Sequence, residues 1–185
     1  SGRFLFLARF STIKGPDLAI EACRKAGVGL DLIGDTSITN EPEFLEQCRR
    51  KCDNPRPGGN MLFEGNRPPI YMIGPCTRGE AVWWFSQAHC LLHPNFPAPH
   101  LGHPGFREPF GLAPVEAMAC GCPCVLNDIP ALREVAAGAS NLVDFTRVEE
   151  TTGILHAVLT DKVSASRLRI AGLERAMAFS FDRLA

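Results

Sequence analysis

Hydrophobic residues along this chain form short apolar runs, and longer segments of mixed polarity separate them. The first run, Arg3 to Phe10, is almost continuously apolar, as is typical of a strand buried on both faces of a parallel sheet. Pro16 suits the first turn of a following helix, and Gly27 is placed to end it. Val28 to Asp35 then predicts a second strand. The chain therefore opens with a strand, a helix and a strand.

The same alternation continues along the rest of the chain. Asn40 with Glu43, and Thr77 with Glu80, are spaced like capping boxes and predict the starts of two helices, the first ending near Cys52. Further strands are predicted at residues 61–65, 70–74, 89–94, 122–128 and 141–143. A helix is predicted before residue 122, a short one at 130–137, and two more close the chain. This order predicts an α/β fold with a Rossmann-like parallel sheet and helices on both faces.

Ligands of such sheets bind at the carboxyl ends of the strands, so the loops that follow strands are the candidate binding segments. These loops are residues 10–15, 34–40, 74–77, 94–111 and 127–130. The fourth loop is rich in Pro, Gly and His. Its two histidines, His100 and His103, lack an evident third ligand, so no metal site is predicted there.

Composition narrows the function classes. The 185 residues fit a single domain, 45% of them are hydrophobic and 21% charged, and the formal net charge is -1. No basic stripe favours a nucleic-acid partner, and no apolar run is long enough to predict a membrane span. The eight cysteines contain no CxxC pair, which argues against a zinc ribbon. We expect them to be mostly buried packing residues in a reducing cytoplasm.

Several familiar fingerprints are missing. No GxGxxG follows the first strand, which weakens a dinucleotide oxidoreductase, and no GxxxxGK[ST] indicates a P-loop NTPase. No Asp-x-Asp, HExxH or GxSxG occurs. We therefore predict no metal and no cofactor.

The segment REPFGLAPVEAMACG, residues 107–121, places two acids on either side of a helix N-terminus. The first-turn N–H groups near Gly111 and Leu112, with the partial positive charge of the helix end, favour a phosphate. Glu108 and Glu116 would repel phosphate but could accept hydrogen bonds from sugar hydroxyls. A ligand with a sugar at each end and a diphosphate between them fits this pattern, which describes a nucleotide-sugar.

Two cations in the first strand-to-helix loop complete the pattern. Arg9 and Lys14 are five residues apart, in a loop that opens at the same edge of the predicted sheet as the helix above. A guanidinium and an ammonium there could clamp two phosphates without a metal.

Two segments, GRFLFLARFSTIKGPDLAIEA (residues 2–22) and REPFGLAPVEAMACGCPCV (residues 107–125), resemble the C-terminal domain of the retaining GT-B glycosyltransferases of family 4, known as glycosyl transferases group 1. The resemblance covers nearly the whole chain. It implies that donor contacts come from Arg9, Lys14, Glu108, Gly111, Leu112 and Glu116. In particular, it implies that Glu108 contacts the transferred sugar as the catalytic carboxylate and that Glu116 holds the ribose. Residues 74–77 resemble the loop that contacts the nucleobase.

The resemblance also implies an absence. GT-B enzymes have two Rossmann-like domains with the active site between them, and residues 1–185 correspond to the donor-binding domain alone. We therefore expect the chain to bind a UDP- or GDP-hexose for metal-independent transfer, but not to turn it over alone. Two alternatives stay open: half of a sugar-nucleotide epimerase, or a non-catalytic nucleotide-sugar-binding module or subunit of a split enzyme.

Two smaller expectations concern packing. Of Trp83 and Trp84, adjacent on a predicted helix, one should lie in the core and the other should face outward, toward a partner. Cys120, Cys122 and Cys124 are expected to pack inside rather than to act as nucleophiles or ligands.

Overall fold

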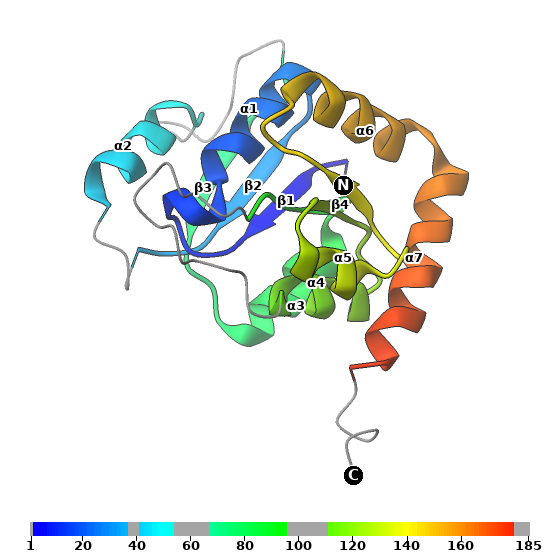
Figure 1. Cartoon of the computed structure of the whole chain (residues 1–185). Helices are drawn as coiled ribbons and strands as arrows, with labels where there is room; N and C mark the ends of the chain where they lie inside the picture. The colour runs from blue at the N-terminus through cyan, green and yellow to red at the C-terminus, as the bar shows by residue number, and fades with distance from the viewer. Residues whose placement is uncertain (1, 37–40, 54–66, 96–110, 180–185) are drawn as a thin grey trace.

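A six-stranded parallel sheet runs through the centre of the molecule (Figure 1). The computed structural model describes residues 2–36, 41–53, 67–95 and 111–179. The strands are β1 Phe4–Leu7, β2 Leu30–Ile33, β3 Ile70–Gly74, β4 Cys90–His93, β5 Cys124–Asn127 and β6 Asn141–Val143. Their order across the sheet is β3-β2-β1-β4-β5-β6, so the direction of winding reverses between β1 and β4. That reversal is the topological switch point at which such sheets bind ligands.

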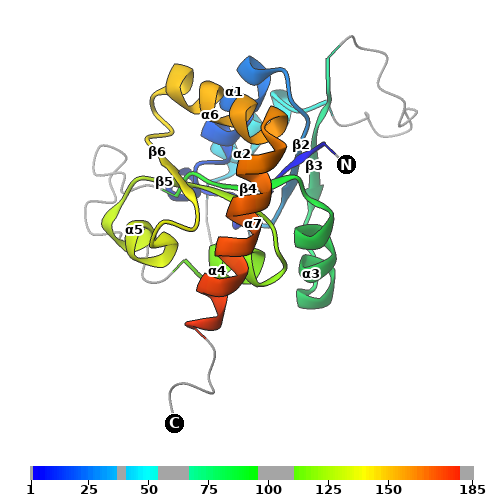
Figure 2. The same ribbon diagram turned by 90° about the vertical axis from the view of Figure 1, so that its right-hand side faces the viewer.

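Helices cover both faces of the sheet (Figures 1 and 2). Helices α1, α2 and α6 lie on one face, α3, α4 and α5 lie on the other, and α7 packs against α4 and α6. Their bounds are α1 Pro16–Ala26, α2 Pro42–Arg50, α3 Arg78–Gln87, α4 Leu112–Ala119, α5 Pro130–Ala136, α6 Val148–Thr160 and α7 Lys162–Met177. A single 3-10 turn, η1 Thr12–Lys14, precedes α1. The predicted α/β, Rossmann-like fold class is confirmed.

The sheet separates two hydrophobic cores because successive strand side chains point to opposite faces. In β1, Phe4 and Phe6 join the cluster under α1 and α6, whereas Leu5 joins the cluster under α3, α4 and α5. Strand β5 behaves in the same way, with Val125 in the first cluster and Leu126 in the second. All five side chains are almost completely buried, which explains the continuous apolar runs of the sequence.

Most predicted elements are confirmed, and the differences lie at their ends. Gly27 ends α1 in the left-handed conformation, and Thr77 with Glu80 forms the predicted capping box. Helix α2 begins later than predicted, at Pro42 with Glu41 as its N-cap. The strand prediction 3–10 was too long, because β1 and its register with β2 end at Leu7, although single backbone hydrogen bonds continue from Ala8 and Phe10. The predicted cap Asn40 and the strand predicted at 61–65 lie outside the described residues.

Two of the three cysteines expected to pack inside, Cys122 and Cys124, are buried, whereas Cys120 is only partly buried against the same core. Burial raises the pKa of the Cys122 thiol to about 12, so it stays protonated at neutral pH. Trp84 packs against the core while the neighbouring Trp83 is 55% exposed. No helix in the described part of the chain combines the length and hydropathy needed to cross a bilayer.

Candidate functional site

The candidate site lies at the carboxyl edge of the sheet, between the ends of β1 and β4. The loop after β1 carries Arg9 and Lys14, and both are partly exposed. A Cβ placed on Gly15 would lie 2.9 Å from the Cβ of Pro94, which follows β4, so the two loops are in contact. The switch point is therefore flanked by the loop that carries both predicted phosphate-binding cations.

Backbone hydrogen bonds hold the Arg9–Lys14 loop in place. The N–H of Phe10 donates to the carbonyl of Asp35 at 2.8 Å, which ties the loop to the end of β2. The N–H of Thr12 donates to Oε2 of Glu41 at 2.8 Å, which ties it to the start of α2. Because the loop is anchored on both sides, its backbone should lose little conformational entropy when a ligand binds to Arg9 and Lys14.

Helix α4 presents its N-terminus at the same edge. Its N-cap is Gly111, which has a φ of 69° and no side chain to cap the first-turn N–H groups. A Cβ at this position would also meet Cδ2 of Leu132 at 2.9 Å, so glycine is required by both conformation and space. Leu112, the first helical residue, is 64% exposed. The helix end can therefore offer N–H donors and a partial positive charge to an anion.

Glu116 lies one turn into α4, with its side chain 40% exposed. The guanidinium Nη2 of Arg78 lies 3.3 Å from its Oε1. Sequence reasoning missed Arg78, although its position signalled a role: it is the first helical residue after the capping Thr77, at the carboxyl end of β3. The structure thus brings a third cation beside the predicted ribose-binding acid.

A cavity of about 420 Å³ opens beside this edge, at the ends of β2 and β3. Gly74 and Pro75 of the loop predicted to contact a nucleobase line it. The rest of its lining comes from Phe10, Gly34, Asp35, Thr36, Leu45, Arg49, Met72 and Ile73. A Cβ on Gly34 would lie only 1.9 Å from the carbonyl oxygen of Ala8, so a glycine is needed where β1 and β2 separate.

Buried polar residues lie beneath the site. Ser11, His93, Asn95 and Asn127 are each at most 4% exposed. The amide Nδ2 of Asn127 donates to the carbonyl of Asn95 at 3.3 Å, and its Oδ1 accepts from the N–H of Phe145 at 3.2 Å. Asn127 therefore links the segment after β4 to the segment after β6. The sequence placed Asn127 both in the predicted strand 122–128 and in the candidate loop 127–130, but gave it no role of its own.

Of the predicted site residues, Arg9, Lys14, Gly111, Leu112 and Glu116 lie at this one edge of the sheet. Glu108 lies outside the described residues, as do the two histidines of the loop before it. Within the described ranges, no group of three or more His, Cys, Asp and Glu side chains is arranged to hold a metal ion.

Comparison with known proteins matches this chain to a glycosyltransferase family. A sequence profile described as Glycosyl transferases group 1 matches residues 2–175. The D-inositol 3-phosphate glycosyltransferase of Jonesia denitrificans is 24% identical over 191 residues, covering 98% of this chain and 40% of that protein. The corresponding Thermobifida fusca protein is 29% identical over 193 residues, covering 96% of this chain and 39% of that protein. The chain thus spans about two fifths of these curated relatives.

Solved structures share the fold. Sucrose-phosphate synthase from Thermosynechococcus elongatus matches with a TM-score of 0.75 at 22% identity, covering 98% of this chain and 42% of that one. The Anabaena protein HepE, solved in complex with UDP-glucose, matches with a TM-score of 0.73 at 19% identity, covering 96% of this chain and 44% of that one.

Proposed function

The chain belongs to the glycosyl transferases group 1 family, and on this premise we propose that it is the donor-binding part of a glycosyltransferase. One observation carries the proposal. The loop with Arg9 and Lys14 and the N-terminus of α4 lie at the same edge of the sheet, on the elements that flank its switch point. This arrangement suits a nucleoside diphosphate-sugar.

In this proposal the diphosphate lies between the two cations and the helix N-terminus. Arg9 can form two parallel hydrogen bonds to phosphate oxygens, and Lys14 adds a point charge. When the sugar leaves, negative charge grows on the diphosphate, and the same groups stabilise that charge. They would do so without a metal, as the resemblance implies.

The nucleoside and the sugar occupy opposite ends of the site. Glu116 accepts hydrogen bonds from the ribose hydroxyls, displacing Arg78, and residues 74–77 contact the base. The sugar lies toward Glu108, the proposed catalytic carboxylate of a retaining hexosyl transfer. HepE binds UDP-glucose, which favours UDP over GDP as the nucleotide here. The acceptor and its binding residues belong to the part of the relatives that this chain does not span.

Calorimetric titration tests the proposal. The chain is titrated with UDP, GDP, ADP and TDP, then with the glucose and mannose conjugates of the nucleotide that binds. We expect one diphosphate to bind, and its bare nucleoside to bind at least about tenfold more weakly, because the nucleoside lacks the charge-assisted contacts. Equal affinity for nucleoside and diphosphate would overturn the proposed phosphate clamp.

A further inference from the structure

A second group of cations lies at the opposite edge of the sheet from the candidate site. Asp53 precedes β3, and its N–H donates to the carbonyl of Ile70, at the amino end of that strand. Helices α1 and α2 both end nearby. The side chains gathered here belong to neither the Arg9–Lys14 loop nor α4.

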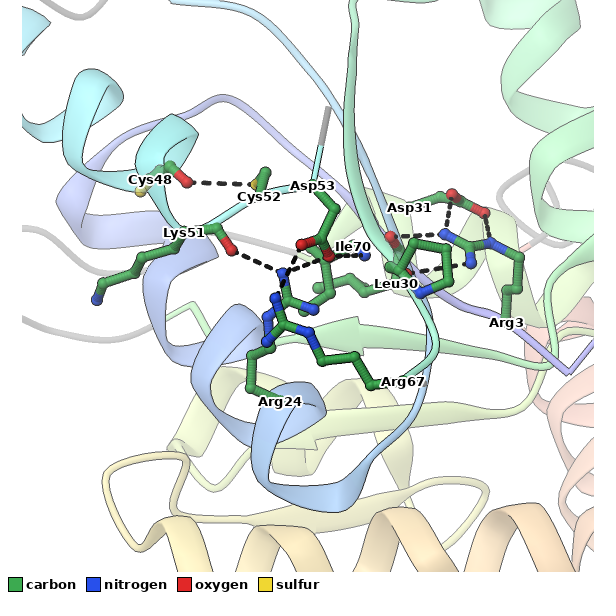
Figure 3. Close-up of polar contacts among 11 residues, drawn as sticks. Arg3, Arg24, Leu30, Asp31, Cys48, Lys51, Cys52, Asp53, Arg67 and Ile70 are labelled. Carbon is green, nitrogen blue, oxygen red and sulfur yellow. Dashed lines mark hydrogen bonds and ion pairs between the residues drawn. The ribbon is translucent and has the colours of Figure 1, made fainter. Parts of the chain in front are cut away.

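One carboxylate serves two guanidinium groups at this edge (Figure 3). Arg24 Nη2 contacts Oδ2 of Asp53, and Arg67 Nη2 lies 3.0 Å from its Oδ1. Oδ2 also accepts from the N–H of Ile70 at 2.9 Å. Figure 3 shows the two guanidinium groups side by side over this single carboxylate. Asp53 therefore neutralises only one of the two charges.

The unbalanced charge faces a cavity. A cavity of about 600 Å³ is lined by Ile20, Glu21, Arg24, Arg50, Lys51 and Arg67. Three carboxylates offset part of this charge: Glu21 in the lining, Asp53, and Glu46, which lies 3.2 Å from Arg50. The four cations therefore exceed them by one charge.

The Arg24 side chain indicates, independently of the charge balance, that a hydrogen-bond acceptor is missing at this site. Its Nη2 donates to the carbonyl of Lys51 at 2.9 Å as well as to Asp53. Its Nη1 is buried and finds no hydrogen-bond partner among the residues that the structure describes. Leaving a buried charged donor unpaired is costly, so an acceptor at this position would stabilise it.

Helix ends explain part of this charge. Arg24, Arg50 and Lys51 lie where α1 and α2 end, and cations there offset the partial negative charge of exposed carbonyls. Arg67 belongs to no helix, yet its guanidinium shares the Asp53 carboxylate with that of Arg24. The positive charge that helix ends do not explain therefore lies at Arg67, next to Arg24.

We propose that this cavity binds the phosphate group of a phosphate ester, at a second anion site distinct from the nucleotide-sugar site. Guanidinium groups match phosphate oxygens in geometry as well as charge, and Arg24 and Arg67 provide two at adjacent positions. Arg50 and Lys51 raise the local positive potential around them. The phosphate ester is either a small soluble molecule or a lipid headgroup.

Inorganic phosphate is the first probe, added at constant ionic strength while the arginine Nε–H signals are followed by NMR. An Arg9→Ala background removes the proposed phosphate clamp at the other edge of the sheet. We expect saturable shifts at Arg24 and Arg67, and an affinity at least about tenfold lower in an Arg50→Gln, Arg67→Gln double variant. Arg167→Gln, which removes an exposed guanidinium from α7, is the matched control and should leave the affinity unchanged.

Vesicles of phosphatidylglycerol in phosphatidylcholine distinguish a lipid headgroup from a small soluble phosphate ester as the ligand. Cosedimentation that the double variant abolishes identifies a lipid headgroup, whereas phosphate binding without cosedimentation identifies a soluble ester. The proposal would be overturned if the Arg24 and Arg67 Nε–H signals shifted no more with phosphate than with chloride. It would also be overturned if Arg167→Gln lowered the phosphate affinity as much as the double variant does. Loss of nucleotide binding in the Arg9→Ala background, with the phosphate response retained, shows that the two sites are separate.

Discussion

Charged residues differ in role between the two edges of the sheet. Arg24 and Asp53 form a pair whose side chains are only 19% and 9% exposed, so their charges are largely fixed in the protein. Arg78 and Glu116 form a looser contact in which the arginine is 91% exposed. Such an exposed pair contributes little to stability and is easily separated by a ligand. Stability and binding should therefore respond to different substitutions.

Replacing Glu116 by alanine should weaken binding of both the nucleoside and the nucleoside diphosphate. The variant loses charge-assisted hydrogen bonds to the ribose, so we expect roughly tenfold weaker binding of each ligand by calorimetry. Glu134→Ala removes an exposed acid from α5 and is the control. An unchanged affinity for the diphosphate in Glu116→Ala would remove Glu116 from the site.

Replacing Arg9 by alanine should weaken binding of the diphosphate much more than binding of the nucleoside. Because the guanidinium is proposed to contact phosphate alone, the diphosphate should lose roughly tenfold or more in affinity, while the nucleoside loses little. The same calorimetric titrations measure both. Equal losses for the two ligands would indicate a general structural effect rather than a phosphate contact.

Replacing Asp53 by asparagine should destabilise the protein by about 3 kcal/mol at neutral pH, because Arg24 is left without its buried partner. Burial raises the pKa of Asp53, but the hydrogen bond from Ile70 and the Arg24 guanidinium outweigh it, so the pKa lies below its usual value. A lowered folded-state pKa gives stability that is present above about pH 4 and lost as the pH falls through that lower pKa.

Urea unfolding at neutral and acidic pH measures this effect. The difference between wild type and Asp53→Asn should be large at pH 7 and shrink below about pH 4. Asp128→Asn is the matched control, since its partner Arg133 is 59% exposed and the pair should contribute less than about 1 kcal/mol. A difference for Asp53→Asn that does not depend on pH would mean that its charge is not responsible.

At the scale of elements, local signals predicted helices well and long-range contacts decided the rest. The capping box at Thr77 and the glycine after α1 use only neighbouring residues, so the sequence sufficed for both. The start of α2 at Pro42 also had a local signal, since proline suits the first helical position. The sequence did not show that the carboxylate of Glu41 accepts from the N–H of Thr12, twenty-nine positions earlier. The Arg78–Glu116 contact likewise joins α3 to α4, and no local pattern encodes it.

Gly111→Ala tests whether the conformation before α4 matters. A residue with a side chain at φ 69° costs about 1 kcal/mol, and contact with Leu132 adds to this, so we expect a loss of about 2 kcal/mol in unfolding free energy. Diphosphate binding should weaken as the helix N-terminus shifts. Gly153→Ala, inside α6 with open space around it, should instead stabilise by up to about 1 kcal/mol.

At the scale of the whole molecule, the chain accounts for about two fifths of its relatives, so binding and turnover should separate. We expect the chain to bind the donor alone and to transfer sugar only when the remaining part of such a protein is supplied in trans. Product formation with radiolabelled donor measures this. Donor binding without transfer to any of several hydroxyl acceptors, even with that part present, would favour a non-catalytic binding module.

A crystal structure of the chain with UDP, or with whichever diphosphate binds most tightly, would show the proposed contacts themselves. We expect the diphosphate between Arg9, Lys14 and the N-terminus of α4, with the ribose hydroxyls on Glu116 and Arg78 displaced from that carboxylate. A nucleotide bound away from the switch point between β1 and β4, or with its ribose turned away from Glu116, would contradict this expectation.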